Sequence, residues 1–193
     1  MKIIKPEKGV FGYINKKRII ETIKTIILFA FAVGLYLIGY ITLKTNKSLW
    51  TIFAVLSVLP AAKSAVSMIM FLRFSSIEKD LYSAIESVRG NIATAYEYVF
   101  TTNEKSYYIK ACSCKNNTII ALLDNSSKKD LSNEIKEHIN VAIAREGFKG
   151  YSLKIYTSSK DYIDRLTEMN ENLGTTQDLS YERIFDLFNA ITL

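Results

Sequence analysis

Few side chains in this sequence occur in arrangements that could perform chemistry, and the most unusual of them is Lys63. It lies near the middle of a long apolar run, three residues after Pro60. A lysine within membrane hydrocarbon costs at least about 2.5–3.5 kcal/mol, and a proline inside a helix removes a backbone hydrogen bond and can kink the helix. One interpretation is a kinked helix that presents a cation to an anionic lipid, a substrate or a partner helix. Because only nine residues separate Lys63 from the end of the run, the preferred interpretation is that its long side chain reaches the membrane interface.

A cluster of basic residues precedes the first apolar run and consists of Lys16, Lys17, Arg18 and Lys24. Anionic lipids on the cytoplasmic leaflet stabilise each such charge by about 1 kcal/mol. We therefore expect these four side chains to contact the anionic headgroups of a lipid bilayer and to help orient the chain in the membrane.

The sequence contains little that could bind a metal or a cofactor. Cys112 and Cys114 flank one serine, and His138 is the only histidine. A structural zinc site commonly uses two such cysteine pairs, and there is no second pair. We therefore expect buried free cysteines, a structural histidine, and neither a metal nor a cofactor. No nucleophile elbow, P-loop, Rossmann glycine pattern, kinase signature or metalloprotease helix occurs, so no catalytic residue is assigned and an enzyme is not favoured.

The net charge of +6 is unevenly distributed along the 193 residues. Residues 1–24 and 25–72 are basic, whereas residues 73–193 contain more acidic than basic side chains. Hydrophobic residues make up 49% of the chain, which excludes intrinsic disorder. The basic excess belongs to the apolar end of the chain, so nucleic acid is not an expected partner.

Two apolar runs, at about 25–43 and 49–72, predict a transmembrane helical hairpin. A helix as long as the first run spans roughly 29 Å, close to the thickness of a bilayer's hydrocarbon core. More Lys and Arg flank the hairpin than lie in its connecting loop, so the positive-inside rule places both termini in the cytoplasm. The expected location is the plasma membrane, with two spans. The alternative is a buried helical pair in a soluble protein.

The remaining sequence predicts a basic cytoplasmic segment at 1–24 and a cytoplasmic α/β (α+β) domain at 73–193. Apolar periodicity in the domain predicts helices at about 76–93, 129–145, 160–173 and 180–191, and strands at about 96–101, 107–112, 118–123 and 151–156. Asn116 and Asn117, between the second and third strands, can adopt the positive φ angles of a tight turn. This order predicts a mixed four-stranded sheet with flanking helices.

The element order of the soluble part is similar to the core of the restriction-endonuclease-like fold. Those nucleases carry an acid on the second strand and an acid-x-lysine pattern on the third, and these hold a divalent metal. Here the two strands read YYIKAC and TIIALLD, and the nearest acids are Glu97 and Asp124. The resemblance therefore implies the fold without its catalytic motif.

The first 75 residues also resemble a set of uncharacterised two-helix membrane proteins of Gram-positive bacteria. The resemblance is carried by KIIKPEKG-x-x-GYI at 2–14 and TIFAVLSVLPAAKS at 51–64. It implies a bacterial plasma membrane and supplies no activity.

Three hypotheses for the function follow from these patterns. The leading one is an integral membrane protein that tethers a cytoplasmic interaction domain, whose partner is an unidentified protein or a second copy of the chain. The second is a divergent nuclease-like domain that processes nucleic acid, which requires Glu97, Lys110 and Asp124 to converge. The third is a transporter or channel subunit, which requires oligomers lined by Lys63.

Overall fold

The structure, a computed structural model, describes residues 7–43, 49–102, 105–124, 129–148, 150–172 and 180–193. The chain divides into two compact units. The hairpin unit is Ile14–Ser75, and the sheet unit combines Ser76–Leu193 with the residues up to Tyr13. The segment just before the apolar hairpin therefore packs with the sheet, to which it is distant in sequence.

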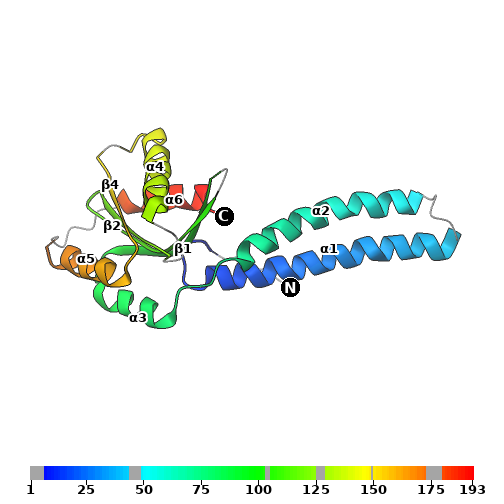
Figure 1. Ribbon diagram of the computed structural model, residues 1–193, viewed down its shortest axis with the longest axis horizontal. Helices are drawn as coiled ribbons and strands as arrows, with labels where there is room; N and C mark the ends of the chain where they lie inside the picture. Colours follow the sequence, from blue (N-terminus) through cyan, green and yellow to red (C-terminus); the bar gives the residue numbers. More distant parts are fainter. Residues whose placement is uncertain (1–6, 44–48, 103–104, 125–128, 149, 173–179) are drawn as a thin grey trace. The chain divides into compact units, whose positions relative to one another are not determined.

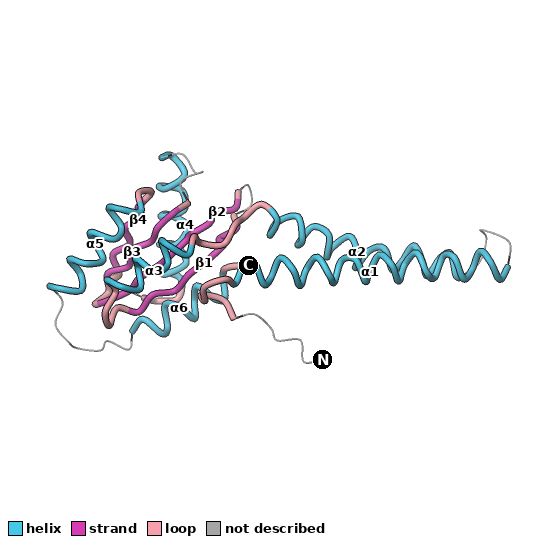
Figure 2. The backbone as a smooth tube through the Cα atoms, turned by 90° about the horizontal axis from the view of Figure 1, so that it is seen from below, coloured by secondary structure: helices cyan, strands magenta, loops and turns pink. Residues whose placement is uncertain are grey.

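Two long helices, α1 (Tyr13–Leu43) and α2 (Leu49–Leu72), form the hairpin unit and lie side by side (Figures 1 and 2). Both are long and apolar enough to cross a membrane. The first predicted apolar run is thus helical but is only part of α1, which begins at Tyr13 because the basic segment continues the same helix. The second predicted span coincides with α2. The predicted connecting loop lies outside the described residues.

Small residues at a seven-residue spacing form the contact between α1 and α2. Ala32 on α1, and Ala54 and Ala61 on α2, are all buried. The hydroxyl oxygens of Thr25 and Ser64 lie 2.9 Å apart at a buried position between the helices. Small side chains let helices approach closely, and a hydroxyl pair adds a hydrogen bond between them. Together these contacts fix the register of the two helices.

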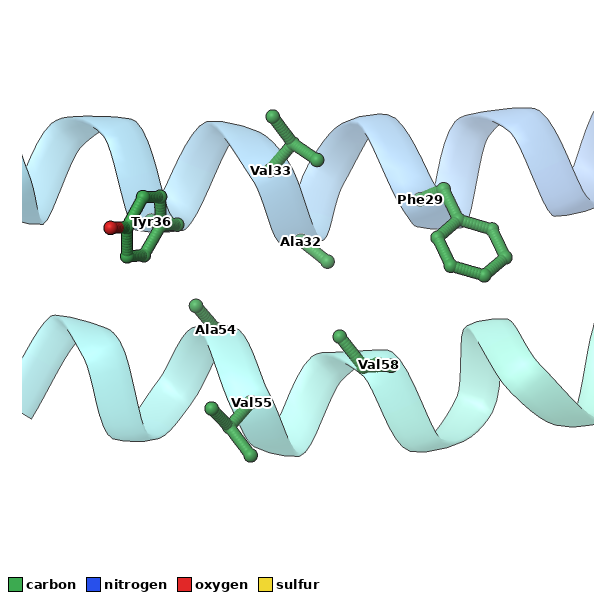
Figure 3. Close-up of a pocket in the computed structure, with 7 residues that line it drawn as sticks. All are labelled: Phe29, Ala32, Val33, Tyr36, Ala54, Val55 and Val58. Atoms are coloured by element: carbon green, nitrogen blue, oxygen red, sulfur yellow. The ribbon is translucent and has the colours of Figure 1, made fainter.

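An open apolar groove of about 220 Å³ lies between the two helices, near their connected ends. Ala32 from α1 points toward Ala54 and Val58 from α2 (Figure 3). The groove exists because alanines leave space that the larger neighbours Phe29 and Tyr36 only partly fill. Its sides are wholly apolar, as expected for a surface that faces lipid chains.

The sheet unit contains the predicted mixed four-stranded sheet. Its strands are β1 (Ala93–Thr101), β2 (Ser106–Lys115), β3 (Thr118–Leu123) and β4 (Ser152–Tyr156). They lie side by side in the order β1-β2-β3-β4 (Figure 2). The first two pairs are antiparallel, and β3 pairs with β4 in parallel. The parallel pair is connected by helix α4 (Lys129–Arg145), as a crossover between parallel strands requires.

Helices cover both faces of the sheet (Figure 1). One core cluster joins the sheet to α4 and α6 (Ser180–Ile191) through residues such as Ile139 and Phe188. The other joins it to α3 (Lys79–Val88) and α5 (Ser159–Asn172) through residues such as Ile85 and Leu166. The sheet unit is therefore a three-layer arrangement with the sheet in the middle.

The predicted helix at 76–93 is too long, because α3 ends at Val88. Gly90 adopts φ +52°, and a Cβ atom there would lie 2.5 Å from the side-chain oxygen of Asn170. Both the positive φ and the close contact favour glycine, so the chain leaves the helix there and begins β1 at Ala93. The turn between β2 and β3 is as predicted, with φ +46° at Asn116 and +58° at Asn117.

Candidate functional site

The most unusual feature of the sheet unit is Glu97, a buried carboxylate in the middle of β1. Its side chain is 1% exposed, and its backbone adopts φ +60°. This left-handed conformation costs a non-glycine residue about 1–2 kcal/mol. A strained, buried acid within a strand indicates that its surroundings hold it in place.

The backbone irregularity at Glu97 changes the direction in which the side chains of β1 point. Ala95 and Tyr98 both enter the cluster beneath α4 and α6, although strict alternation would place them on opposite faces. Lys110 stands opposite on β2, where the register with β3 shifts between Ile109 and Ala111. Matching irregularities in adjacent strands thus direct Glu97 and its neighbours away from the regular pleat.

One oxygen of Glu97 accepts hydrogen bonds from both of the chain segments that flank the hairpin. Oε1 accepts hydrogen bonds from the backbone N–H of Gly12, at 3.0 Å, and of Ile77, at 3.2 Å. The hydroxyl of Ser76 also donates to it. Gly12 directly precedes α1, and Ser76 follows α2 by a few residues. We call this set of residues the Glu97 junction.

Tyr108, Lys110 and Asp124 lie next to the Glu97 junction on β2 and at the end of β3. Lys110 Nζ and Asp124 Oδ1 form an ion pair at 3.0 Å. Burial raises the pKa of Tyr108 far above its usual range, and the negative charges of Glu97 and Asp124 raise it further. The three groups that the nuclease hypothesis requires are therefore near one another, but Glu97 binds backbone and Asp124 binds lysine.

The outer edge of β1 is closed by residues from both ends of the described chain. Gly9 O accepts from the backbone N–H of Tyr96 at 2.9 Å, and Val99 O accepts from that of Leu193 at 3.0 Å. A Cβ atom at Gly9 would lie 2.8 Å from the Tyr98 hydroxyl, so this close approach requires glycine. Covering the edge in this way removes a site for unwanted strand pairing.

Comparisons of the chain with protein families, curated proteins and solved structures found no match. The resemblances drawn from the sequence therefore stay predictions.

The predicted lipid-contacting residues lie on α1, where an acid that sequence analysis missed organises two of them. Glu21 is 6% exposed and pairs with Lys17 at 3.2 Å and with Lys24 at 3.4 Å. Lys16 is exposed and Arg18 is half-buried. The sequence contained a signal for this role, because Glu21 is the only acidic residue between positions 14 and 75 and has basic residues three and four positions away.

The predicted pair on α2, Pro60 and Lys63, is exposed on the surface of the hairpin unit. The helix continues through Pro60. Lys63 forms no ion pair with any residue that the structure describes. Its neighbour Ser64 is the residue that meets Thr25 on α1, which places Lys63 at the start of the uncharged part of α1 rather than at the middle of the hairpin.

The sulfur and imidazole groups occupy structural positions. Cys112 and Cys114 are buried thiols, and burial, with Cys114 nearby, raises the pKa of the Cys112 thiol well above its usual range. His138 is half-buried on α4. Among the described residues, no group of three or more His, Cys, Asp or Glu side chains could hold a metal ion.

Replacing Glu97 with alanine should destabilise the sheet unit and loosen both flanking segments. Each buried donor that loses its acceptor costs about 1–3 kcal/mol, so the free energy of unfolding of the full chain in detergent should fall by at least about 2 kcal/mol. Hydrogen exchange at the amides of Gly12 and Ile77 should accelerate, which mass spectrometry measures.

Two variants control this experiment. Glu97→Gln keeps an oxygen acceptor and should have a smaller effect than Glu97→Ala. Glu134→Gln alters an exposed carboxylate that accepts from Tyr107 and Lys105, and should leave exchange at Gly12 and Ile77 unchanged. Unaltered exchange at these amides in Glu97→Ala would show that the junction does not hold the segments.

The raised pKa of Tyr108 predicts how stability depends on alkaline pH. Above the ordinary tyrosine value of 10.0, the unfolded chain loses the phenolic proton while the folded chain retains it. The stabilisation is therefore fully present below pH 10 and declines by about 1.4 kcal/mol per pH unit above it. The free energy of unfolding, measured with urea at a series of alkaline pH values, should therefore decline less steeply with pH in Tyr108→Phe, by about that amount. The same decline in Tyr108→Phe and in the parent would mean that Tyr108 ionises in the folded state.

Proposed function

We propose that the protein is an integral plasma-membrane protein that holds a cytoplasmic interaction domain at the membrane surface. The observation that carries this proposal is the distribution of exposed apolar side chains. Apart from Val10 and Val141, all the large hydrophobic residues found exposed in the described chain lie on α1 and α2. Such a continuous apolar surface is unfavourable in water and is expected of helices that face lipid.

The lengths of the helices and the residues at their ends agree with two membrane spans. α1 has 31 residues, or about 46 Å of helix, close to the thickness of a bilayer with its headgroups. Tyr40 and Trp50, near the connected ends, are exposed, as in the aromatic belts of membrane proteins. More basic residues flank the opposite ends than lie between the two helices, which supports cytoplasmic termini.

The chemistry of the sheet unit favours binding over catalysis. The oxygen of Glu97 that the junction uses accepts three hydrogen bonds, and Asp124 pairs with Lys110. Both acids therefore contribute to the fold. A domain confined to a surface meets partners there at a raised local concentration, so tethering alone provides a function.

The orientation can be tested by labelling single introduced cysteines in intact cells. Asn46→Cys lies in sequence between α1 and α2 and should react with a membrane-impermeant maleimide. Ala190→Cys, exposed on α6, should react only after the membrane is permeabilised. Cys112 and Cys114 are buried, so the parent chain serves as the unreactive control. Labelling of Ala190→Cys in sealed cells would contradict cytoplasmic termini.

The interaction role can be tested by cross-linking in native membranes. The full chain should capture a defined set of proteins that is not captured by a matched control, in which residues 14–75 anchor an unrelated domain. Proteins captured by the full chain but not by the control bind the sheet unit, whereas proteins captured by both are only close to the membrane anchor. Recovery of the same proteins with both chains would contradict an interaction domain.

A further inference from the structure

Lys63 lacks an acidic partner on the hairpin unit, and the sequence explains why. Glu21 is the only acidic residue between positions 14 and 75. It is buried and already pairs with Lys17 and Lys24. A second copy of the hairpin would bring only another buried Glu21, so it could not supply an accessible carboxylate. No carboxylate of the hairpin unit, in this chain or in a second copy, is thus accessible to Lys63, and an anionic lipid headgroup can supply the counter-charge.

The helix register brings Lys63 to the same level and the same side as Lys24. Thr25 and Ser64 face each other between antiparallel helices, with their hydroxyl oxygens 2.9 Å apart. Lys24 and Lys63 each precede one of these residues. In an antiparallel pair, residues one step before two facing positions lie on the same side, separated by roughly 3 Å along the axis. Two ammonium groups therefore flank one side of the helix pair.

The depth of this lysine pair matches that of lipid phosphates, an argument that rests on the proposed membrane insertion. The uncharged part of α1 runs from Thr25 to Leu43 and spans roughly 29 Å. The hydrocarbon core of a bilayer is about 30 Å thick. Lys24 and Lys63 thus lie at its edge, where flexible lysine stems reach the headgroups.

We propose that Lys24 and Lys63 bind the phosphate of one anionic glycerophospholipid of the cytoplasmic leaflet. Glu21 acts as a positioning residue, since its contact with Lys24 at 3.4 Å restrains that ammonium group. Lys17, Lys24 and Lys63 outnumber Glu21, so the local charge is positive. An anionic headgroup such as phosphatidylglycerol neutralises this charge, whereas the choline of phosphatidylcholine brings a further cation.

The test is native mass spectrometry of the full chain in micelles titrated with phosphatidylglycerol or phosphatidylcholine. The parent should bind one phosphatidylglycerol more tightly than phosphatidylcholine. Lys63→Gln should weaken this binding about fivefold, the factor that corresponds to about 1 kcal/mol per basic residue. Lys63→Arg should restore it. Circular dichroism verifies that each variant keeps its helices.

Lys136→Gln is the matched control, because it removes the same charge from an exposed site on α4 that is not among the residues expected to contact lipid. It should change the affinity less than twofold. Equal weakening by Lys136→Gln and Lys63→Gln would show a general effect of net charge and overturn the proposal, as would equal affinity for the two lipids. If the lipid-binding proposal fails, the cysteine-labelling experiment can still show two membrane spans. Failure of lipid binding is therefore distinguishable from failure of the proposed membrane function.

Discussion

The hydrogen bonds to one buried oxygen of Glu97 unite parts of the sheet unit that are distant in sequence. Backbone N–H groups at Gly12 and Ile77 occur where the chain approaches α1 and where it returns from α2. Buried N–H groups outside regular structure need an acceptor, and a carboxylate accepts more strongly than a neutral group. These bonds offset the strained backbone at Glu97, so the strain and the attachment of both segments are parts of one arrangement.

The hairpin unit is held together by different contacts, and within a bilayer, where we propose that it lies, two helices gain little from the hydrophobic effect. Its contacts are close approaches at alanines and one hydroxyl pair between Thr25 and Ser64. The same pair determines which residues of α1 and α2 lie level with each other. The basic residues Lys16, Lys17, Arg18 and Lys24 lie in the first part of α1, whereas Tyr40 and Trp50 lie near the connected ends of the two helices.

Local patterns predicted the parts of the structure that depend on neighbouring residues. The apolar runs, the element order, the mixed sheet and the turn at Asn116 and Asn117 all follow from periodicity or turn chemistry. The Glu97 junction could not be predicted, because its partners lie up to 85 positions away in sequence. An acid on a strand has the same local signature whether it binds a metal or backbone amides. The position of Lys63 level with Lys24 could not be predicted either, since it depends on the register of two helices.

The closed edge of β1 has a consequence for biogenesis. Tyr13 and Lys8 bond to carbonyl groups of Leu193 and Asn189, so a segment that is translated before the hairpin completes the sheet unit only after α6 has been translated. The hairpin leaves the ribosome before β1 can acquire these neighbours. Until then, the outer edge of this strand presents unpaired backbone groups. Anchoring the hairpin in the bilayer, as proposed, would separate the nascent chain from other copies during that interval and so protect it against aggregation.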